Sequence, residues 1–261
     1  MAQPELAANA LMDDIMVQCE RFYFKLGPFS GLGEFEKARI ERDIRVKIDD
    51  LSKLSKGLGH AAMMCLEASL GNEKAMTSAH NQSLNYIDEQ AVYLNYAGRL
   101  NLIGHTKKAI QALETYLETN SPSLKIIWLL SVLYRAIGLF SEDAKLMKTY
   151  SKLKDSKIDA HLPITIGFDE YLTEHGITQE ESEYYFTLVN NFFHSNRIKE
   201  YQFSRSIMED DEGENWISTE FHIQDDLSSD QIHSMNMGLL KLLAKSDISD
   251  KAFDHFVTSI Y

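Results

Sequence analysis

Two glycines in the middle of this chain, Gly104 and Gly138, are 34 residues apart, and their surroundings repeat at the same interval. An internal period of this length is typical of stacked units that each contain two helices joined by a tight turn. The period therefore predicts an array of helical hairpins, and such arrays offer extended surfaces for partners. The pairs that keep the interval are Ala97 with Ser131, Leu100 with Tyr134, Leu113 with Met147, and Tyr116 with Tyr150.

The clearest unit spans residues 91–122 and resembles the tetratricopeptide repeat (TPR) family. That family places a small residue first, a large apolar residue three positions later, a glycine four after that and an alanine five further on. The two small residues leave room for close helix contact, and the glycine permits a turn conformation that other residues avoid. The matching residues in this chain are Ala97, Leu100, Gly104 and Ala109.

The following unit, residues 126–153, is similar to the same family but less regular. Asp143 stands where the family has alanine, and Ala144 comes one place late. The resemblance covers residues 58–153 and is strongest over 91–150. In the family, the first helix of each repeat lines a concave face that holds a peptide. The resemblance therefore implies a partner-binding groove, lined in the first repeat by Leu94, Asn95, Gly98 and Asn101 and in the next by Trp128, Leu129, Val132 and Arg135.

Apolar residues recur at intervals of three and four along much of the remaining chain, as one buried helix face requires. This spacing predicts helices over residues 5–26 and 34–55, a helical hairpin over 58–86, and helices over 165–175 and 178–196. Segment 27–33 is rich in glycine and is interpreted as a turn between helices, because no strand precedes it. Thr178 and Glu181 have the spacing of a capping box.

The pattern changes near the C-terminal end to strict alternation of apolar and polar residues. Residues 201–207 and 216–223 alternate in this way, which predicts the two strands of a β-hairpin. Two helices are predicted to follow and to cover one face of the hairpin. The first starts at a capping box of Ser228 and Gln231, and the second carries apolar residues from Ala252 to Ile260. The acidic turn between the strands contains Glu209, Asp210, Asp211, Glu212 and Glu214.

The expected fold is therefore mainly α, with an array of TPR-like hairpins followed by a small α+β domain. The charge distribution supports two domains. Residues 1–155 contain 19 Lys and Arg and 19 Asp and Glu, whereas residues 156–261 contain 7 and 20, so the net charge of -13 lies in the second part. We predict a helical-repeat domain over 1–155 and an acidic domain over 156–261. The excess of carboxylates disfavours nucleic acid as a partner, because phosphates are repelled.

No pattern in the chain is typical of a catalytic or metal-binding site. The acidic turn fails the calcium-loop template, since Thr219 stands where that template has its last glutamate. The nine histidines form no HExxH motif and no Cys–His pairing. We therefore expect a protein that is not an enzyme and has no cofactor or metal, and we interpret the acidic turn as a solvated hairpin tip.

The two cysteines, Cys19 and Cys65, have no metal-ligand spacing and are expected to be reduced and partly buried, as in cytoplasmic proteins. The first residues are acidic and lack the apolar core of a signal peptide. No run approaches the roughly 18 apolar residues of a membrane span. These features predict a cytoplasmic location and no association with membranes.

Together the observations favour a module that binds a protein or a peptide in the groove of the repeats. Two other classes stay open. An inhibitor or immunity-type protein would use the acidic C-terminal part to neutralise a basic toxin or a nucleic-acid enzyme. A self-assembling structural component would receive its own C-terminal segment, residues 253–261, in the groove. The sequence predicts no particular oligomeric state.

Overall fold

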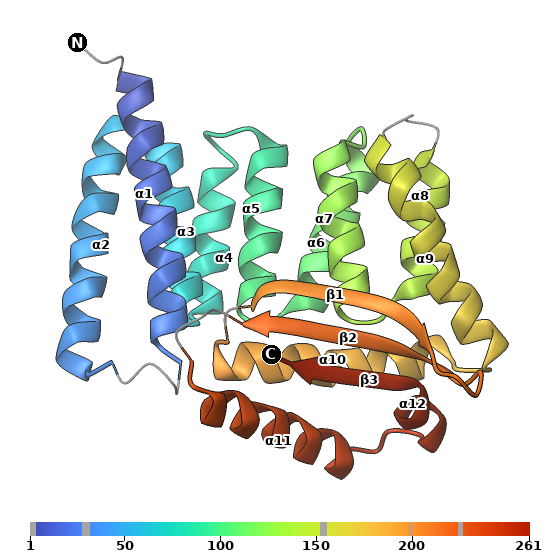
Figure 1. The fold of residues 1–261 in the computed structure, drawn as a ribbon. Coiled ribbons are helices and arrows are strands. Elements are labelled where there is room, and N and C mark those ends of the chain that lie inside the picture. The colour runs from blue at the N-terminus through green and yellow to red at the C-terminus, as the bar shows by residue number, and fades with distance from the viewer. Residues whose placement is uncertain (1–3, 28–31, 152–155, 199, 224–226) are drawn as a thin grey trace. The chain divides into compact units, whose positions relative to one another are not determined.

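A computed structural model describes residues 4–27, 32–151, 156–198, 200–223 and 227–261, which form twelve helices and three strands (Figure 1). The prediction of a mainly helical array followed by a small α+β part is confirmed. Internal contacts divide the chain into two compact units. The first comprises Met1–Leu129 with His194–Arg197, and the second comprises Leu130–Phe193 with Ile198–Tyr261.

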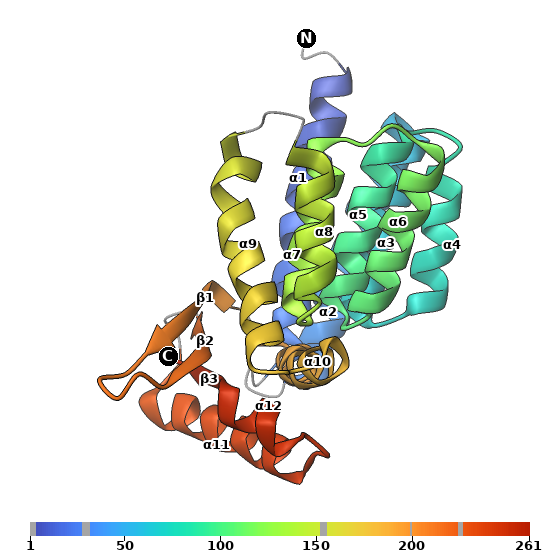
Figure 2. The same ribbon diagram turned by 90° about the vertical axis from the view of Figure 1, so that its right-hand side faces the viewer.

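Six helices make up most of the first unit, and neighbours in sequence lie side by side in Figures 1 and 2. Residues 28–31 of the turn predicted over 27–33 lie outside the described residues. The apolar spacing of the first three helices produces a shared core, which includes Ile15, Cys19, Phe22, Ile44, Ile48, Leu51, Ala62, Cys65 and Leu66. The helices are α1 (Pro4–Lys25), α2 (Glu34–Leu54), α3 (Lys56–Leu70), α4 (Glu73–Ser83), α5 (Glu89–Leu102) and α6 (Thr106–Thr119).

The glycines of the repeat occupy equivalent turns, as predicted. Gly71, Gly104 and Gly138 have φ angles of +75°, +82° and +74°, a region that residues with a Cβ rarely adopt. Each follows a helix and makes the same pair of hydrogen bonds: its own N–H and the next N–H donate to the preceding turn. This is the Schellman motif, which satisfies carbonyls at a helix end. Gly176, with φ +59°, ends a further helix in the same way.

Four more helices follow: α7 (Leu124–Ala136), α8 (Phe140–Tyr150), α9 (Ser156–Glu174) and α10 (Gln179–Asn196). The predicted capping box is present at the start of α10, where Thr178 N–H donates to Glu181 Oε2 at 2.8 Å and Glu181 N–H donates to Thr178 Oγ1 at 3.1 Å. The division between the units falls within α7 and near the end of α10. That residues 1–155 form a separable domain stays a prediction.

The second unit contains a three-stranded sheet in the order β1-β2-β3. The predicted hairpin is present as β1 (Glu200–Glu209) and β2 (Asn215–Ile223), which pair antiparallel. Helix α11 (Ser229–Lys245) begins at the predicted capping box of Ser228 and Gln231. The prediction of a final helix reaching Ile260 is wrong: α12 (Asp250–His255) is short, and Phe256–Ile260 form β3, parallel to β2.

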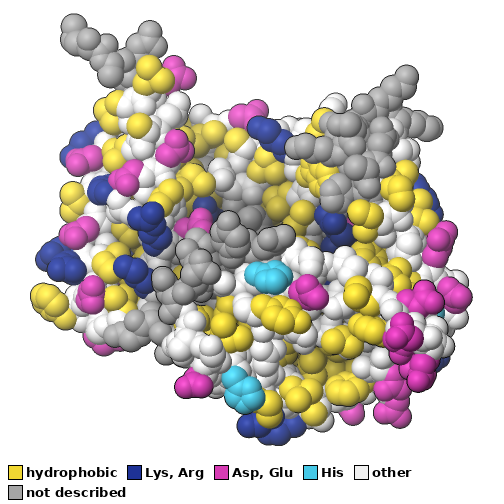
Figure 3. Space-filling view, in the orientation of Figure 1, with side chains coloured by type: hydrophobic (Ala, Val, Ile, Leu, Met, Phe, Trp, Pro, Cys, Tyr) yellow, Lys and Arg dark blue, Asp and Glu magenta, His cyan; other side chains and the backbone are white. Residues whose placement is uncertain are grey.

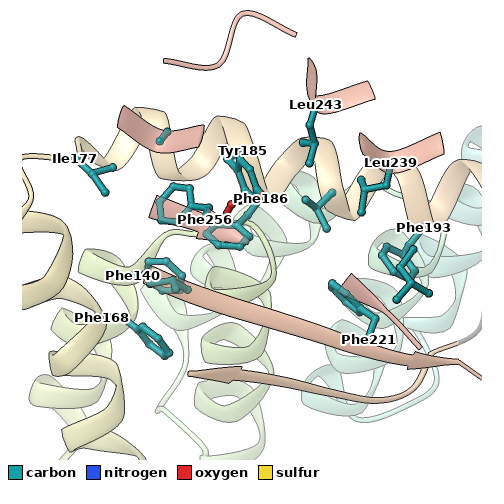
Figure 4. Close-up of a cluster of buried hydrophobic side chains, with 14 of the residues drawn as sticks. Phe140, Phe168, Ile177, Tyr185, Phe186, Phe193, Phe221, Leu239, Leu243 and Phe256 are labelled. Carbon is teal, nitrogen blue, oxygen red and sulfur yellow. Dashed lines mark hydrogen bonds between the residues drawn. The ribbon is translucent and has the colours of Figure 1, made fainter. Parts of the chain in front are cut away.

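The core of the second unit lies between the sheet and the helices and is rich in aromatic rings (Figure 4). Phe186 from α10 contacts Phe140 from α8 and Phe256 from β3, with ring centroids 5.5 and 4.9 Å apart. Arg205 from β1 brings a guanidinium against this core, 4.0 Å from the centroid of Phe186. Its charge is satisfied there by the ring faces and by hydrogen bonds to Thr219 Oγ1 and to the Arg135 carbonyl.

None of the helices in the described part of the chain has the combination of length and apolar composition that crossing a membrane requires.

Candidate functional site

A pocket of about 220 Å³ lies between α1 and α5 in the first unit. The residues from α5 recur at intervals of three and four, so one face of this helix opens to the pocket. The walls combine apolar side chains with a carboxylate, an amide and a guanidinium, so the pocket offers both contact area and directional hydrogen bonds. They are formed by Glu20 and Phe24 from α1 and by Leu94, Asn95, Gly98, Arg99 and Leu102 from α5.

Gly98 is one of the residues of α5 that line the pocket. A Cβ added at this position would meet no other atom within 4 Å, and the φ angle is not in the positive region that favours glycine. Glycine inside a helix is less stable than alanine by about 0.5–1 kcal/mol. The backbone and the packing of α5 therefore do not require glycine at this position.

Asn95 and Arg99 are four residues apart on α5, and their polar groups share the pocket face. Asn95 is half-buried, and its amide has no hydrogen-bond partner among the described residues. Arg99 is also half-buried, and its guanidinium hydrogen-bonds the Cys65 side chain and forms no ion pair with a described carboxylate. Partly desolvated polar groups of this kind favour a ligand that carries hydrogen-bond acceptors.

The two cysteines, Cys19 from α1 and Cys65 from α3, are fully buried in the core of the first unit. Burial raises the pKa of Cys19 to about 12 and also raises the pKa of Cys65, against the opposing effect of Arg99. Both thiols therefore stay protonated near neutral pH. Since the thiolate is the reactive form, neither cysteine suits a nucleophilic role. Ser69 Oγ lies within hydrogen-bond distance of the Cys19 and Cys65 carbonyls, at 2.7 and 3.0 Å.

A four-residue segment, His194–Arg197, holds the C-terminal ends of α1, α3 and α5. Arg197 donates hydrogen bonds to the carbonyls of Tyr23 and Ser69, at 3.2 and 3.1 Å. Its guanidinium also lies 4.7 Å from the ring centroid of Tyr23. His194 Nδ1 donates to the Leu102 carbonyl at 3.1 Å. A cation near two helix C-termini is stabilising because it complements the helix dipoles, so this segment fixes the helices that carry the pocket.

The residues predicted to line the groove have different environments. Leu94, Asn95 and Gly98 line the pocket. Asn101 is used inside the fold, because its Oδ1 accepts a 2.8 Å hydrogen bond from Thr106 Oγ1 at the turn between α5 and α6. Trp128 is half-buried on α7 in the first unit. Arg135, further along α7, belongs to the second unit and is 17% exposed.

Arg135 forms an ion pair with the buried Asp143. This aspartate, at the position where the repeat pattern has alanine, is fully buried, and its Oδ2 lies 3.4 Å from Arg135 Nε and 3.2 Å from Thr165 Oγ1. Burial raises the pKa of Asp143, whereas Ser131, Arg135 and Thr165 lower it. The Arg135 guanidinium thus compensates a buried carboxylate in its own helical hairpin.

Replacing Asp143 with alanine restores the repeat pattern, yet we expect it to destabilise the protein by about 3 kcal/mol, because Arg135 is left buried without its partner. The double substitution Asp143→Ala with Arg135→Leu is expected to cost less than about 1 kcal/mol, since both charges are removed together. Urea denaturation of the four proteins of this cycle measures the coupling. Equal losses in the single and double variants would contradict the pairing.

The acidic turn is solvent-exposed from Glu209 to Glu214, and its carboxylates gather at the right-hand edge of Figure 3. Asp210 organises it: its Oδ1 accepts hydrogen bonds from the N–H groups of Glu212 and Glu214, both at 2.9 Å. Gly213 has φ +83°, as a tight turn requires. In the described residues, no group of three or more His, Cys, Asp or Glu side chains is arranged to hold a metal ion.

The groove prediction did not include four of the seven pocket residues. Arg99 and Leu102 lie one helical turn from residues that the repeat pattern selects. Helical spacing from Asn95 could therefore have placed both on the pocket face of α5. Glu20 and Phe24 come from α1, some 70 residues earlier in the chain. Nothing in their local sequence indicates that α1 packs beside α5.

Comparison of the chain with models of known protein families, with curated proteins and with solved structures finds no match.

Proposed function

We propose that this protein binds a polypeptide partner and that the pocket between α1 and α5 receives one side chain of that partner. The pocket volume suits a single large residue. Phe24, Leu94 and Leu102 supply apolar contact, whereas Asn95 and Arg99 supply hydrogen-bond donors to carbonyl or carboxylate groups. The partly buried amide of Asn95, without a partner among the described residues, is the observation that carries the proposal.

The arrangement of the helices supports a binding module, and one observation counts against each of the two other classes. Helical hairpins that repeat side by side expose a row of helices, which is the arrangement that peptide-binding arrays use. The self-assembly alternative has less support, because residues 256–260 already pair with β2 in the same chain. The inhibitor alternative depends on the charge of the acidic C-terminal part, and solvated carboxylates provide little shape for recognition.

Peptides selected from a displayed random library on the full-length chain test this function. The Gly98→Leu variant is expected to weaken binding of the selected peptides at least tenfold, because the new side chain occupies pocket volume and starts from a Cβ position that has no other atom within 4 Å. Asn95→Ala is expected to weaken binding of the same peptides by about three- to tenfold, because one hydrogen bond is lost. Fluorescence polarisation with labelled peptides gives both dissociation constants.

Gly167→Leu is the matched control. Gly167 also lies within a helix, α9, and a Cβ there would likewise meet no atom within 4 Å. Its peptide affinities are expected to equal those of the wild type. If the selected peptides bind Gly98→Leu as tightly as the wild type, and circular dichroism shows both to be folded, the pocket is not the binding site.

A further inference from the structure

Two histidines that are 80 residues apart in the sequence meet in the second unit. His175 follows the end of α9, and His255 is the last residue of α12. Their ring centroids are 4.5 Å apart with an interplanar angle of 63°. Both side chains are half-buried, so the pair is supported by the fold and still reached by solvent.

The hydrogen bonds at Tyr171 determine which ring nitrogen carries the proton. The Tyr171 hydroxyl has a single hydrogen and donates it to the Asn215 carbonyl, at 2.8 Å. The same hydroxyl, 2.7 Å from His255 Nδ1, must therefore accept a hydrogen bond from that nitrogen. His175 Nδ1 lies 3.0 Å from the Tyr171 carbonyl, which can only accept, so it also donates. In the neutral form, both imidazoles consequently carry a free lone pair on Nε2.

We propose that His175 and His255 form a binding site for a transition-metal ion such as Zn²⁺ or Cu²⁺, coordinated through the two Nε2 atoms. Metal–nitrogen bonds of about 2.0–2.1 Å place the metal about 3.2 Å from each ring centroid, so the centroids of two imidazole ligands are about 4.5 Å apart at a ligand angle near 90° and about 5.2 Å apart at the tetrahedral angle. The observed 4.5 Å corresponds to the angle near 90° that Cu²⁺ prefers. Hydrogen bonds from Nδ1 to oxygen acceptors are the arrangement that orients metal-bound histidines.

The surroundings of the pair contain charges of both signs. Lys251 donates a hydrogen bond to the Gly176 carbonyl at 3.1 Å, so an ammonium next to His175 opposes the binding of a cation. The acidic turn has the opposite effect on cation binding. It ends at Glu214, immediately before Asn215 in the sequence, and its carboxylates raise the local concentration of cations. The described residues supply no third ligand, so water or a group of a partner completes the coordination.

Titration of the chelator-treated, full-length chain with ZnCl₂ in a calorimeter tests this site. We expect one equivalent to bind, and we expect His175→Gln and His255→Gln each to weaken binding at least tenfold. Tyr171→Phe removes the group that orients His255 without removing a ligand, and is expected to weaken binding by about 10- to 100-fold. His233→Gln, on the exposed side of α11, is the control and should leave the affinity unchanged.

A second measurement does not depend on whether the variants fold. Electron paramagnetic resonance of the wild-type chain with one equivalent of Cu²⁺ reports the number of coordinated nitrogens. Two imidazole nitrogens are expected. A spectrum without coordinated imidazole, or a double variant His175→Gln/His255→Gln that binds zinc as the wild type does, would overturn the proposal.

Discussion

Lowering the pH from 7 to 4 is expected to reduce the free energy of unfolding of the first unit by about 6 kcal/mol through two buried histidines. Burial lowers the pKa of His80 to about 4 and is also the main cause that lowers the pKa of His194 to about 4. Both groups titrate near pH 6.5 in an unfolded chain. Between pH 6.5 and 4 the unfolded state therefore binds protons that the folded state does not, and stability falls as the pH falls.

The environment of His80 explains why it resists protonation. Its ring stacks on Tyr96 with centroids 3.9 Å apart, and it meets Tyr93 edge-on at 5.3 Å. Its Nδ1 has no hydrogen-bond partner among the described residues, so nothing there stabilises the charged form. His80→Phe keeps an aromatic ring at this position and cannot titrate. It is expected to remove about half of the pH dependence, or about 2 kcal/mol between pH 7 and 5.

Tryptophan fluorescence can follow this unit alone. Trp128 belongs to the first unit and Trp216 to the second, so a Trp216→Phe background leaves one reporter. Urea unfolding at several pH values then gives the stability of the first unit in wild-type, His80→Phe and His194→Gln proteins. His233→Gln serves as the control, because this histidine is exposed. Identical pH dependence in all four proteins would show that neither buried histidine determines acid stability.

Alanine substitutions at the three equivalent turn glycines are expected to differ strongly in cost, although their φ angles are similar. A Cβ at Gly71 would come no closer than 3.9 Å to any neighbour, and at Gly104 it would lie 3.2 Å from His194 Cβ. At Gly138 it would lie 2.6 Å from Phe186 Cδ2 and 2.7 Å from the Ser182 carbonyl oxygen. All three share a strain of about 1–2 kcal/mol for a positive φ. Gly138 adds overpacking of about 1–3 kcal/mol.

We therefore expect losses of about 1–2 kcal/mol at Gly71 and somewhat more at Gly104. At Gly138 we expect a loss of about 3–5 kcal/mol, because displacement of Ser182 would also weaken the 2.9 Å hydrogen bond that Ser182 Oγ donates to the Gly138 carbonyl. Gly213→Ala, with φ +83° and nothing within 4 Å, measures the conformational cost alone. Chemical denaturation provides all four values. A loss at Gly138 no larger than that at Gly213 would mean that the turn relaxes freely around the new side chain.

Features that depend on a few neighbouring residues were predicted well from the sequence. The turn glycines and both capping boxes need only residues close in the chain, and each has the predicted geometry. The last strand shows the limit. Phe253, Phe256 and Ile260 fit a helical period, but Val257, Thr258 and Ile260 are β-branched and favour a strand. This segment forms a strand and not a helix because it can pair with the open edge of β2. Pairing with a strand that is distant in the sequence leaves no local signal.

The candidate site was predicted in part for the same reason. Spacing on one helix selects Leu94 and Asn95, and the structure places both at the pocket. The environment of Arg135 depends on an aspartate in the next helix, so its burial beside Asp143 follows from tertiary packing. The histidine pair joins two segments that are 80 residues apart, and only the folded chain brings them together.

The segment that holds α1, α3 and α5 has a consequence for how the chain matures during translation. Arg197 supplies hydrogen bonds to carbonyls of Tyr23 and Ser69, which leave the ribosome more than 120 residues earlier. The first unit is therefore complete only after most of the polypeptide has been synthesised. Until then, its early helices expose backbone acceptors and part of their apolar surface, which is the state that chaperones bind and that aggregates. A nascent chain stalled before residue 194 should accordingly be more sensitive to protease than one stalled after the whole segment has emerged.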